Sequence, residues 1–426
     1  MRRYESYKDS GVEWLGEVPS HWNLIPNKYI FKLRKNVVGK RSSEYDLLSL
    51  SLKGVIKRDM ENPEGKFPAE FDTYQEVKEG DFIFCLFDVE ETPRTVGLSS
   101  YHGMITGAYT IFETNNVDKK FIYYFYLNLD SNKRLKPLYK GLRNTISKET
   151  FFSFNTFIPP LSEQQKIAQF LDDKTAKIDQ AVDLAEKQIA LLKEHKQILI
   201  QNAVTRGLKP DVPLKDSGVE WIGQVPEHWD VKKLKYLAKL SPSKSEITCN
   251  HEESCSFIPM EKLKLNTLIL DEIKQIKNVY SAYTYFRDED LLIAKVTPCF
   301  ENKNFAIAKN LVNSIGFGSS EIYVLRAYNN LFNKFLFYRL QEQNFMEIAI
   351  SKMSGTGGLK RVPSEFINNF QLALPPLCEQ QKIADYLDTQ TAKIDQAIAL
   401  KTAHIEKLKE YKSVLINDVV TGKVRV

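Results

Sequence analysis

The chain has 426 residues, of which 43% are hydrophobic and 27% charged, with a formal net charge of +5. This length exceeds the range over which one hydrophobic core keeps growing, so we expect two or three domains, and the composition excludes a disordered chain. The mildly basic balance fits nucleic-acid binding without requiring it. Because there is no signal-peptide core and no run of about 18 apolar residues, we expect no membrane association and a cytoplasmic location.

The stretch KDSGVEWLGEVPSHW at residues 8 to 22 returns as KDSGVEWIGQVPEHW at residues 215 to 229. These two copies contain all four tryptophans of the chain, Trp14, Trp22, Trp221 and Trp229. Tryptophans can serve as platforms on which bases stack. Because these are confined to the repeated blocks, we favour anchors that hold each domain to the helix ends, and we interpret the repeated His21 and His228 as structural.

Each block is followed by a long insert, and the two inserts hardly resemble one another. GDFIFCLF (80 to 87) and DLLIAKV (290 to 296) are short apolar runs that predict buried strands. FIYYFYLNL (121 to 129) and NKFLFYRLQ (333 to 341) are buried segments whose periodicity does not distinguish a helix from a strand. The mixture predicts α+β domains.

Near the end of each insert, YKGLRNTISKETF (139 to 151) aligns without a gap over GTGGLKRVPSEFI (355 to 367). Gly141 then matches Gly357, at a place that suits a turn with unusual backbone angles. Basic side chains on such a loop can reach phosphates or base edges, although a solvated loop with ordinary lysines gives the same pattern. The candidates for DNA contact are Lys140, Arg143 and Lys148 in the first copy and Lys352, Lys360 and Arg361 in the second.

Long helices are predicted after each proline pair, in PPLSEQQKIAQFLD from residue 159 and PPLCEQQKIADYLD from residue 375. We expect Ser162 to cap the first helix, with Glu163 in its first turn. Apolar residues then recur alternately every three and four positions, which is typical of a coiled coil. The apolar seam comprises Leu171, Ile178, Val182, Ile189, Leu192 and Leu199 in the first helix and Leu387, Ile394, Ile398, Ile405, Leu408 and Leu415 in the second.

The same register puts polar residues at equivalent seam positions of the two helices, Thr175 with Thr391 and Lys196 with Lys412. Buried polar residues can fix the register of a coiled coil, although the lysines could equally extend to solvent at a frayed end. Two matched seams in one chain are natural partners. An antiparallel pair from Leu171 to Ala203 would be roughly 50 Å long.

The repeat is cyclic, because joining the end of the chain to its beginning would make the two halves continuous. A cyclic repeat implies pseudo-two-fold symmetry. The predicted fold class is α+β, with two globular domains joined by two long helices in an antiparallel coiled coil.

Signatures of catalysis are absent from the sequence. It contains no phosphate-binding loop, no GxSxG, no HExxH and no Asn-Pro-Pro-aromatic motif of an amino-methyltransferase. Five cysteines without a CxxC pair indicate reduced thiols. The segment CNHEESC offers Cys249, His251 and Cys255 as metal ligands, but the spacing matches no familiar zinc pattern, so we favour a loop with incidental thiols. We predict no catalytic residue and no metal site.

The paired PPL-x-EQQ-KIA blocks, each followed by a heptad helix, and the EWLGEVPSHW and EWIGQVPEHW blocks resemble the specificity (S) subunit of a type I restriction-modification system. The resemblance covers the layout of the whole chain. LLIAKVTPCFEN (291 to 302) also resembles a recurrent target-recognition stretch, which adds Lys295 and the adjoining Lys303 to the candidates. The implied domains are target recognition domain 1 at 1–158, spacer helix 1 at 159–210, target recognition domain 2 at 211–374 and spacer helix 2 at 375–426.

The resemblance implies a chain without catalytic activity that reads a bipartite, asymmetric site in double-stranded DNA for phage defence. It also implies two methyltransferase (M) subunits carrying S-adenosylmethionine, for adenine methylation, and restriction/translocase (R) subunits using ATP and Mg²⁺. Two unlike inserts on a repeated frame predict the same kind of site. The alternative is a non-catalytic coiled-coil scaffold with two protein- or glycan-binding modules. The missing motifs disfavour a self-contained restriction-methylation enzyme.

Overall fold

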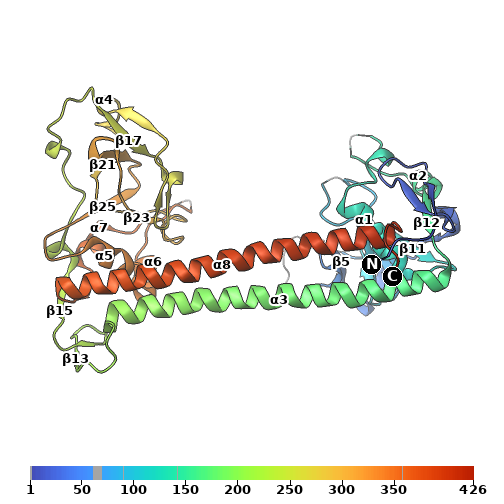
Figure 1. Ribbon diagram of the computed structural model, residues 1–426, viewed down its shortest axis with the longest axis horizontal. Helices are drawn as coiled ribbons and strands as arrows, with labels where there is room; N and C mark the ends of the chain where they lie inside the picture. Colours follow the sequence, from blue (N-terminus) through green and yellow to red (C-terminus); the bar gives the residue numbers. More distant parts are fainter. Residues whose placement is uncertain (1, 61–69, 90, 142, 357) are drawn as a thin grey trace. The chain divides into compact units, whose positions relative to one another are not determined.

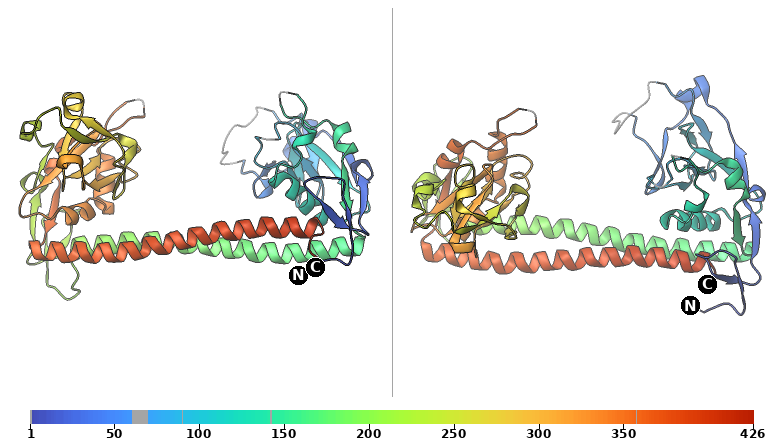
Figure 2. Two further views of the ribbon diagram at one scale, coloured as in Figure 1. Left: turned by 45° about the horizontal axis from the view of Figure 1, so that its top comes forward. Right: turned by 90° about the horizontal axis from the view of Figure 1, so that it is seen from above.

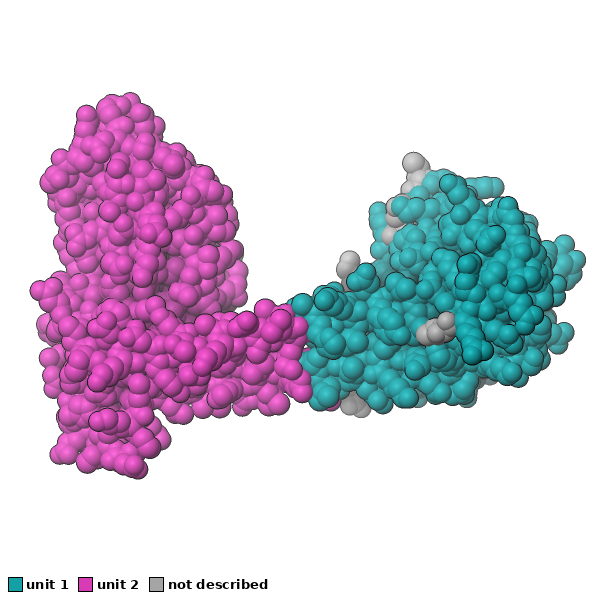
Figure 3. Space-filling view, viewed as in Figure 1, with its two compact units in different colours: residues 1–185, 402–426 teal, residues 186–401 magenta. Residues whose placement is uncertain are grey.

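The computed structural model describes residues 2–60, 70–89, 91–141, 143–356 and 358–426. The chain divides into two compact units, unit 1 with residues 1–185 and 402–426 and unit 2 with residues 186–401 (Figure 3). Two long helices, α3 (Leu161–Arg206) and α8 (Leu377–Val420), each contribute to both units (Figure 1). Each unit therefore contains one insert and a part of both helices.

The two helices run antiparallel. In unit 2, Lys401 Nζ of α8 donates to Gln188 Oε1 of α3 at 2.6 Å. One turn or more further along α3, Lys196 Nζ donates to the Asp395 carboxylate at 2.7 Å. The later residue of α3 thus contacts the earlier residue of α8. This order confirms the antiparallel pairing.

The seam lysines form the same ion pair twice. In unit 1, Lys412 Nζ lies 2.7 Å from both oxygens of Asp179, and this pair corresponds to Lys196 and Asp395 in the alignment of the repeats. The lysine side chains are 30% and 17% exposed, whereas their aspartates are 60% and 57% exposed. The lysines thus extend from the seam to a carboxylate at its rim, where each pair contributes about 0.2–1 kcal/mol.

The seam threonines face the inserts as well as the helix pair. Thr175 is buried and its hydroxyl lies 3.1 Å from that of Tyr124, which also donates to Asp172 at 2.8 Å. These contacts recur in unit 2 with Tyr338, Thr391 and Asp388. The polar seam positions therefore join each helix to its domain.

The first helix begins earlier than the sequence indicates. Helix α3 starts at Leu161, and the N–H groups of Glu163 and Gln164 both donate to the carbonyl of Pro160. Ser162 thus lies inside the first turn, and its assignment as the cap is wrong. Pro160 takes the position before the helix because proline has no N–H group to leave unpaired there.

A buried glutamine fixes each helix to its insert. Gln164 donates through Nε2 to the Pro159 carbonyl at 2.8 Å and accepts at Oε1 from the N–H of Asp118 at 2.8 Å. Gln380 donates to the Pro375 carbonyl at 2.8 Å and accepts from the N–H of Phe332 at 2.8 Å. In both units the first glutamine of EQQ is therefore structural.

The repeated tryptophan blocks bind the helix ends, as predicted. In unit 1, Trp22 is fully buried, donates to Glu163 near the start of α3 at 3.2 Å, and packs against Gly422 after the end of α8. His21 Nε2 lies 2.8 Å from the same glutamate. In unit 2, buried Trp229 packs against Gly207, and His228 lies 2.7 Å from Glu379. The ends of the chain meet in unit 1, where the N–H of Arg425 donates to the carbonyl of Arg2 at 2.8 Å (Figures 1 and 2).

Each insert contains a central four-stranded antiparallel sheet of the same order. In unit 1 the order is β4 (Phe31–Arg34), β11 (Thr110–Thr114), β8 (Phe82–Phe84) and β9 (Val96–Leu98). In unit 2 it is β16 (Ala238–Leu240), β25 (Ile322–Ala327), β22 (Leu291–Ala294) and β23 (Phe305–Ile307). All residues of β8 and β22 are buried, so the strand predictions for GDFIFCLF and DLLIAKV are confirmed.

The two segments of undecided type are helices. They are α1 (Lys119–Ser131), which begins at the capping residue Asp118, and α5 (Asn333–Arg339). Helix α1 contacts β9, and buried Phe121 and Phe125 belong to the core of unit 1 together with Phe31 and Phe82. Tertiary burial on most sides explains why these helices lack a clear polar face.

The remaining elements differ between the inserts. Unit 1 adds the pairs β5 (Leu48–Ser51) with β6 (Gly54–Lys57) and β7 (Gln75–Val77) with β10 (Gly103–Ile105). Unit 2 adds a second four-stranded sheet of β20 (Ile273–Gln275), β17 (Ser254–Ile258), β24 (Ile315–Gly318) and β21 (Thr284–Arg287), together with α4 (Ile276–Val279) and β18 (Leu263–Lys264) paired with β19 (Thr267–Leu268).

Other elements recur in both units. They are β1 (Tyr7–Asp9) with β2 (Glu17–Pro19), β13 (Leu214–Asp216) with β14 (Gln224–Pro226), β3 (Asn23–Pro26) with β12 (Asn155–Ile158), and β15 (Asp230–Lys233) with β26 (Gln371–Leu374). Short helices precede β12 and β26, namely α2 (Lys148–Ser153), α6 (Gln343–Ser351) and α7 (Ser364–Asn369). The fold class predicted from the sequence, two α+β domains joined by two long helices that pair antiparallel, is confirmed.

Replacing Leu408 by Asp should lower the free energy of unfolding by about 2–3 kcal/mol, because Leu408 packs against the core of unit 1 and the carboxylate would lose water there. Leu400→Asp on the same helix is the control, since Leu400 is 65% exposed. Urea unfolding of both variants measures the difference. Equal stability of the two would show that the seam is wrongly assigned.

Candidate nucleic-acid interface

The basic loop of unit 2 pairs with the turn that follows the central strand β22. The N–H of Val362 donates to the carbonyl of Lys295 at 2.9 Å, and the N–H of Thr297 donates to the carbonyl of Lys360 at 3.0 Å. The Thr297 hydroxyl accepts from the N–H of Lys360 at 3.0 Å. Segments far apart in the sequence thus bring Lys295, Lys360 and Arg361 together.

Arg361 is oriented by a carboxylate. Its Nε and Nη2 donate to the two oxygens of Glu321 at 2.8 Å each. This bidentate contact, with the nearby Lys295, holds the pKa of Glu321 below its usual value. The Lys295 ammonium also lies 5.2 Å from the ring centroid of Tyr323. Such a carboxylate fixes the direction of the guanidinium, which leaves one edge of its fork to face a ligand.

Unit 1 contains the same pairing of loop and turn with different side chains. The N–H of Ile146 donates to the carbonyl of Leu86 at 2.8 Å, and the N–H of Asp88 donates to the carbonyl of Arg143 at 2.8 Å. The candidates Lys140, Arg143 and Lys148 are all exposed on or beside this loop. The structure therefore places the three basic residues of unit 1 on one connected surface segment.

Glycines shape both loops. Gly141 has a φ of +72°, which confirms the unusual backbone angle expected there. Its match, Gly357, lies outside the described residues. The neighbouring Gly355 and Gly358 have positive φ values of 151° and 79°, and a Cβ at Gly355 would overlap the Leu359 carbonyl. A larger residue at position 355 would displace the loop.

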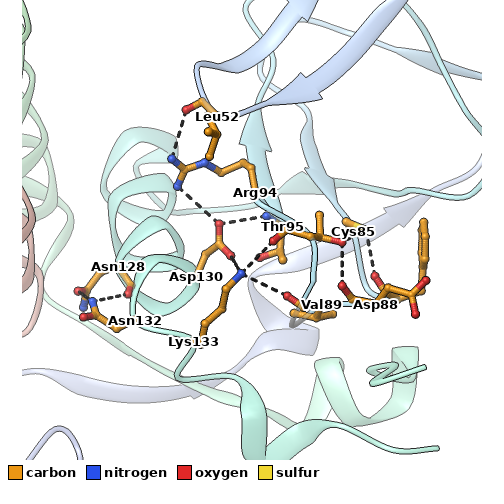
Figure 4. Close-up of polar contacts among 12 residues, drawn as sticks. Leu52, Cys85, Asp88, Val89, Arg94, Thr95, Asn128, Asp130, Asn132 and Lys133 are labelled. Atoms are coloured by element: carbon orange, nitrogen blue, oxygen red, sulfur yellow. Dashed lines mark hydrogen bonds and ion pairs between the residues drawn. The ribbon is translucent and has the colours of Figure 1, made fainter. Parts of the chain in front are cut away.

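A buried carboxylate holds the turn after β8 in unit 1. Asp130 of α1 accepts from the N–H of Thr95 at 3.0 Å and lies 3.5 Å from Arg94 and 3.4 Å from Lys133 (Figure 4). Lys133 Nζ donates in turn to the carbonyl of Thr92 at 2.9 Å and to that of Val89 at 3.2 Å. The Asp130 side chain is only 2% exposed, so this cluster rigidly positions the turn against which the basic loop packs.

Two candidates are placed apart from the paired loop and turn of unit 2. Lys352 is exposed directly after helix α6. Lys303 is half-buried, and its Nζ donates to Gln197 Oε1 of α3 at 2.9 Å and to the Gln341 carbonyl at 2.8 Å. Burial lowers the pKa of Lys303. The Lys303 ammonium is thus hydrogen-bonded to helix α3.

Sequence reasoning missed an aromatic and basic cluster in unit 1. Tyr45 lies 5.5 Å from the ring of His102, and Lys57 Nζ lies 5.4 Å from the ring centroid of Tyr101. These residues line a polar cavity of about 500 Å³ together with Glu44 and Asp46, and Lys57 Nζ pairs with the Asp46 carboxylate at 2.5 Å. The aromatic rings suit the stacking of bases. The cluster carries no sequence signal because its members come from three separate segments.

The cysteine-rich segment of unit 2 is part of the fold. Cys255 is buried in β17, and burial raises its pKa to about 11. His251 packs on Tyr280 with ring centroids 4.5 Å apart. Among the residues that the structure describes, no group of three or more His, Cys, Asp or Glu side chains could hold a metal ion.

The chain matches a known protein family in both of its halves. The family model described as "Type I restriction modification DNA specificity domain" matches residues 104–193 and 226–410. The chain belongs to this family.

Relatives match the chain in part or as a whole. The type I restriction enzyme EcoAI specificity subunit of Escherichia coli is 38% identical over 163 residues, which cover 38% of this chain and 27% of that protein. The match to the EcoEI specificity subunit likewise spans 27% of its length, so the chain matches about a quarter of these two relatives. The putative MjaX specificity subunit of Methanocaldococcus jannaschii is 24% identical over 99% of this chain and 97% of that protein.

Solved structures share the fold. A chain from a structure of complex assembly and conformational transition of a type I R-M system has a TM-score of 0.66 at 14% identity, covering 96% of this chain and 99% of that chain. The HsdS subunit from Thermoanaerobacter tengcongensis has a TM-score of 0.53 at 15% identity, covering 98% of this chain and 100% of that chain. Across the described residues, no helix is both long and apolar enough to cross a membrane.

Asp130→Asn should lower the free energy of unfolding by about 2 kcal/mol, because the half-buried Lys133 and Arg94 would lose the charged form of their buried partner. Asp211→Asn, at an exposed position, is the control and should change stability little. Thermal and urea unfolding test this. A variant as stable as the wild type would show that the cluster does not hold the turn.

Proposed function

We propose that the chain is the DNA specificity subunit of a type I restriction-modification complex and reads a bipartite, asymmetric site. The observation that carries this proposal is the repeated pairing of a basic, glycine-bearing loop with the turn after a central strand, once in each unit. A rigid turn and a cationic loop supply the two kinds of contact that DNA reading requires, contacts to phosphates for position and contacts to base edges for sequence.

The two halves of the site would differ because corresponding loop positions carry different chemistry. Leu86 in unit 1 takes the place of Lys295 in unit 2, and Thr145 takes the place of Arg361. Arginine and lysine donate to guanine in the major groove, whereas a threonine methyl group favours apolar contact with a thymine methyl group, and the Leu86 side chain is buried in the core of unit 1. Similar frames with unlike side chains therefore favour a non-palindromic site.

Partner subunits would supply the chemistry. Two methyltransferase subunits fit a frame whose contacts occur twice, such as Glu163 with His21 and Glu379 with His228. S-adenosylmethionine would bind to those subunits, and ATP and Mg²⁺ to restriction/translocase subunits, so that this chain contributes recognition and positioning. Because the complex would act on host and phage DNA, we expect it in the cytoplasm.

The test is a genome-wide map of methylated adenines before and after deletion of the gene. We expect one split, asymmetric motif to lose its methylation, which would also identify both half-sites. Persistence of every motif, together with no shift of any duplex by the purified chain and a methyltransferase partner at low salt, would favour a scaffold that binds proteins or glycans.

Lys360→Ala should weaken binding roughly fivefold or more and should affect only the second half-site, because Lys360 is exposed on the loop of unit 2. Fluorescence anisotropy with duplexes in which one half-site is scrambled separates the two effects. Scrambling the second half-site should then cost less in the variant than in the wild type. Lys393→Ala removes the same charge from an exposed position of α8 and serves as the control. Equal losses for both half-sites would contradict a local role of Lys360.

A further inference from the structure

Unit 1 contains a cationic cavity, and the proposed role of this unit in reading a DNA sequence does not explain the cavity. The cavity has a volume of about 200 Å³ and lies between α1, the turn before β9 and the last part of α8. Its polar lining residues are Arg94, Asn128, Ser131, Lys409, Lys412 and Ser413. Among the described residues that line it, three are cationic, three carry neutral hydrogen-bonding groups and none is acidic.

Two buried donors of the cavity wall lack an acceptor. Asn128 is 3% exposed, and its Oδ1 accepts from Asn132 at 3.0 Å, but its Nδ2 donates to no described residue. Arg94 directs Nη2 to the Leu52 carbonyl at 3.2 Å and Nη1 toward Asp130, while its buried Nε has no acceptor within the described part of the chain (Figure 4). Unpaired buried N–H groups are costly, so a ligand rich in acceptor oxygens would stabilise this wall.

The carboxylates near these cations stand outside the cavity. Lys412 pairs with Asp179 at 2.7 Å and Lys409 with Glu406 at 3.4 Å, and the two carboxylate side chains are 60% and 68% exposed. Asp130, the partner of Arg94, is buried on the α1 side and does not line the cavity. A lysine ammonium has three donors, so each lysine can retain its carboxylate and still bind an anion.

The corresponding place in unit 2 is occupied by the chain itself. In the alignment of the repeats, Ser413 corresponds to Gln197, which accepts from Lys303 Nζ at 2.9 Å. The same ammonium donates to the Gln341 carbonyl at 2.8 Å. Lys409 corresponds to Lys193, so both helices carry a lysine at this position. In unit 2, however, the ammonium group of Lys303 is bound beside it. Unit 2 therefore provides a matched internal control.

We propose that the cavity of unit 1 binds a phosphate group. A tetrahedral oxyanion presents several acceptors at once, which suits the guanidinium, the two ammonium groups, the amide and the hydroxyls that converge from three elements. Bound there, the phosphate bridges α8 to the turn that Asp130 holds, and so couples the helix to the reading domain. The phosphate comes either from a DNA backbone, which rests on the proposed function, or from a free phosphate or nucleotide.

The first experiment uses the full chain and inorganic phosphate as the probe. We expect phosphate to raise the melting temperature more than chloride does at equal ionic strength, with saturation. Lys409→Gln should weaken phosphate binding roughly tenfold through the loss of a charge-assisted hydrogen bond, as measured by calorimetry. Asn128→Asp, which places a carboxylate at the wall, should abolish it. Lys193→Gln at the matched position of α3 should leave it unchanged.

Two results would overturn the proposal. One is an equal effect of phosphate and chloride on the wild type, and the other is an equal loss of phosphate binding in Lys193→Gln and Lys409→Gln. Lys409 is exposed at the rim, so Lys409→Gln should remain folded even if Asn128→Asp does not.

The salt dependence of binding to duplex DNA identifies the source of the phosphate. If a DNA phosphate occupies the cavity, Lys409→Gln should reduce the slope of log K against log salt by about 1, and Lys193→Gln should not. If the slope is unchanged while binding of inorganic phosphate is lost, the ligand is a free phosphate or nucleotide. A chain that binds phosphate but no DNA would refute the proposed function and leave the phosphate site supported.

Discussion

Buried glutamines at the start of the two long helices tie each domain to its part of the helical frame. Gln164 and Gln380 each satisfy a proline-pair carbonyl and a backbone N–H at the entry to a domain helix. Both side chains are almost fully buried, so loss of either partner would leave an unpaired polar group in the core. Because helices of this length gain most of their stability from packing, the glutamines connect the folding of the inserts to that of the seam.

The tryptophan blocks act on the same helix ends. In each unit a buried tryptophan packs on the glycine after one helix, while a histidine binds the glutamate in the first turn of the other. The backbone has a positive φ just beyond each helix, at Gly207 directly after α3 and at Gly422 two residues after the end of α8, and glycine adopts this conformation without strain. The repeated block thus closes one helix and orients the next, which explains why it occurs twice in one chain.

On this repeated frame the inserts vary in a restricted way. Both retain a central sheet of the same strand order and the pairing of a basic loop with the turn after the central strand. They differ in the side chains on that loop and in the additional sheets. The turn of unit 1 is held by a buried aspartate, whereas Lys303 in unit 2 reaches the helix. The side chains on the loop can therefore differ while the attachment to the helices is preserved.

The sequence by itself determined the repeat, the heptad seam, the cyclic order and the buried strands, because these depend on local spacing and on comparison of one half with the other. It did not determine the start of α3 at Leu161, since Pro160 and Ser162 are both compatible with a helix start. Nor did it distinguish helix from strand in FIYYFYLNL, where burial on most sides removes the periodic signal. Only the tertiary structure decided which basic residues share a surface, that the Lys303 ammonium binds the helix, and that Arg94, Asn128 and Lys409 line one cavity. These relations join residues far apart in the chain, and long-range contacts leave no local pattern in one sequence.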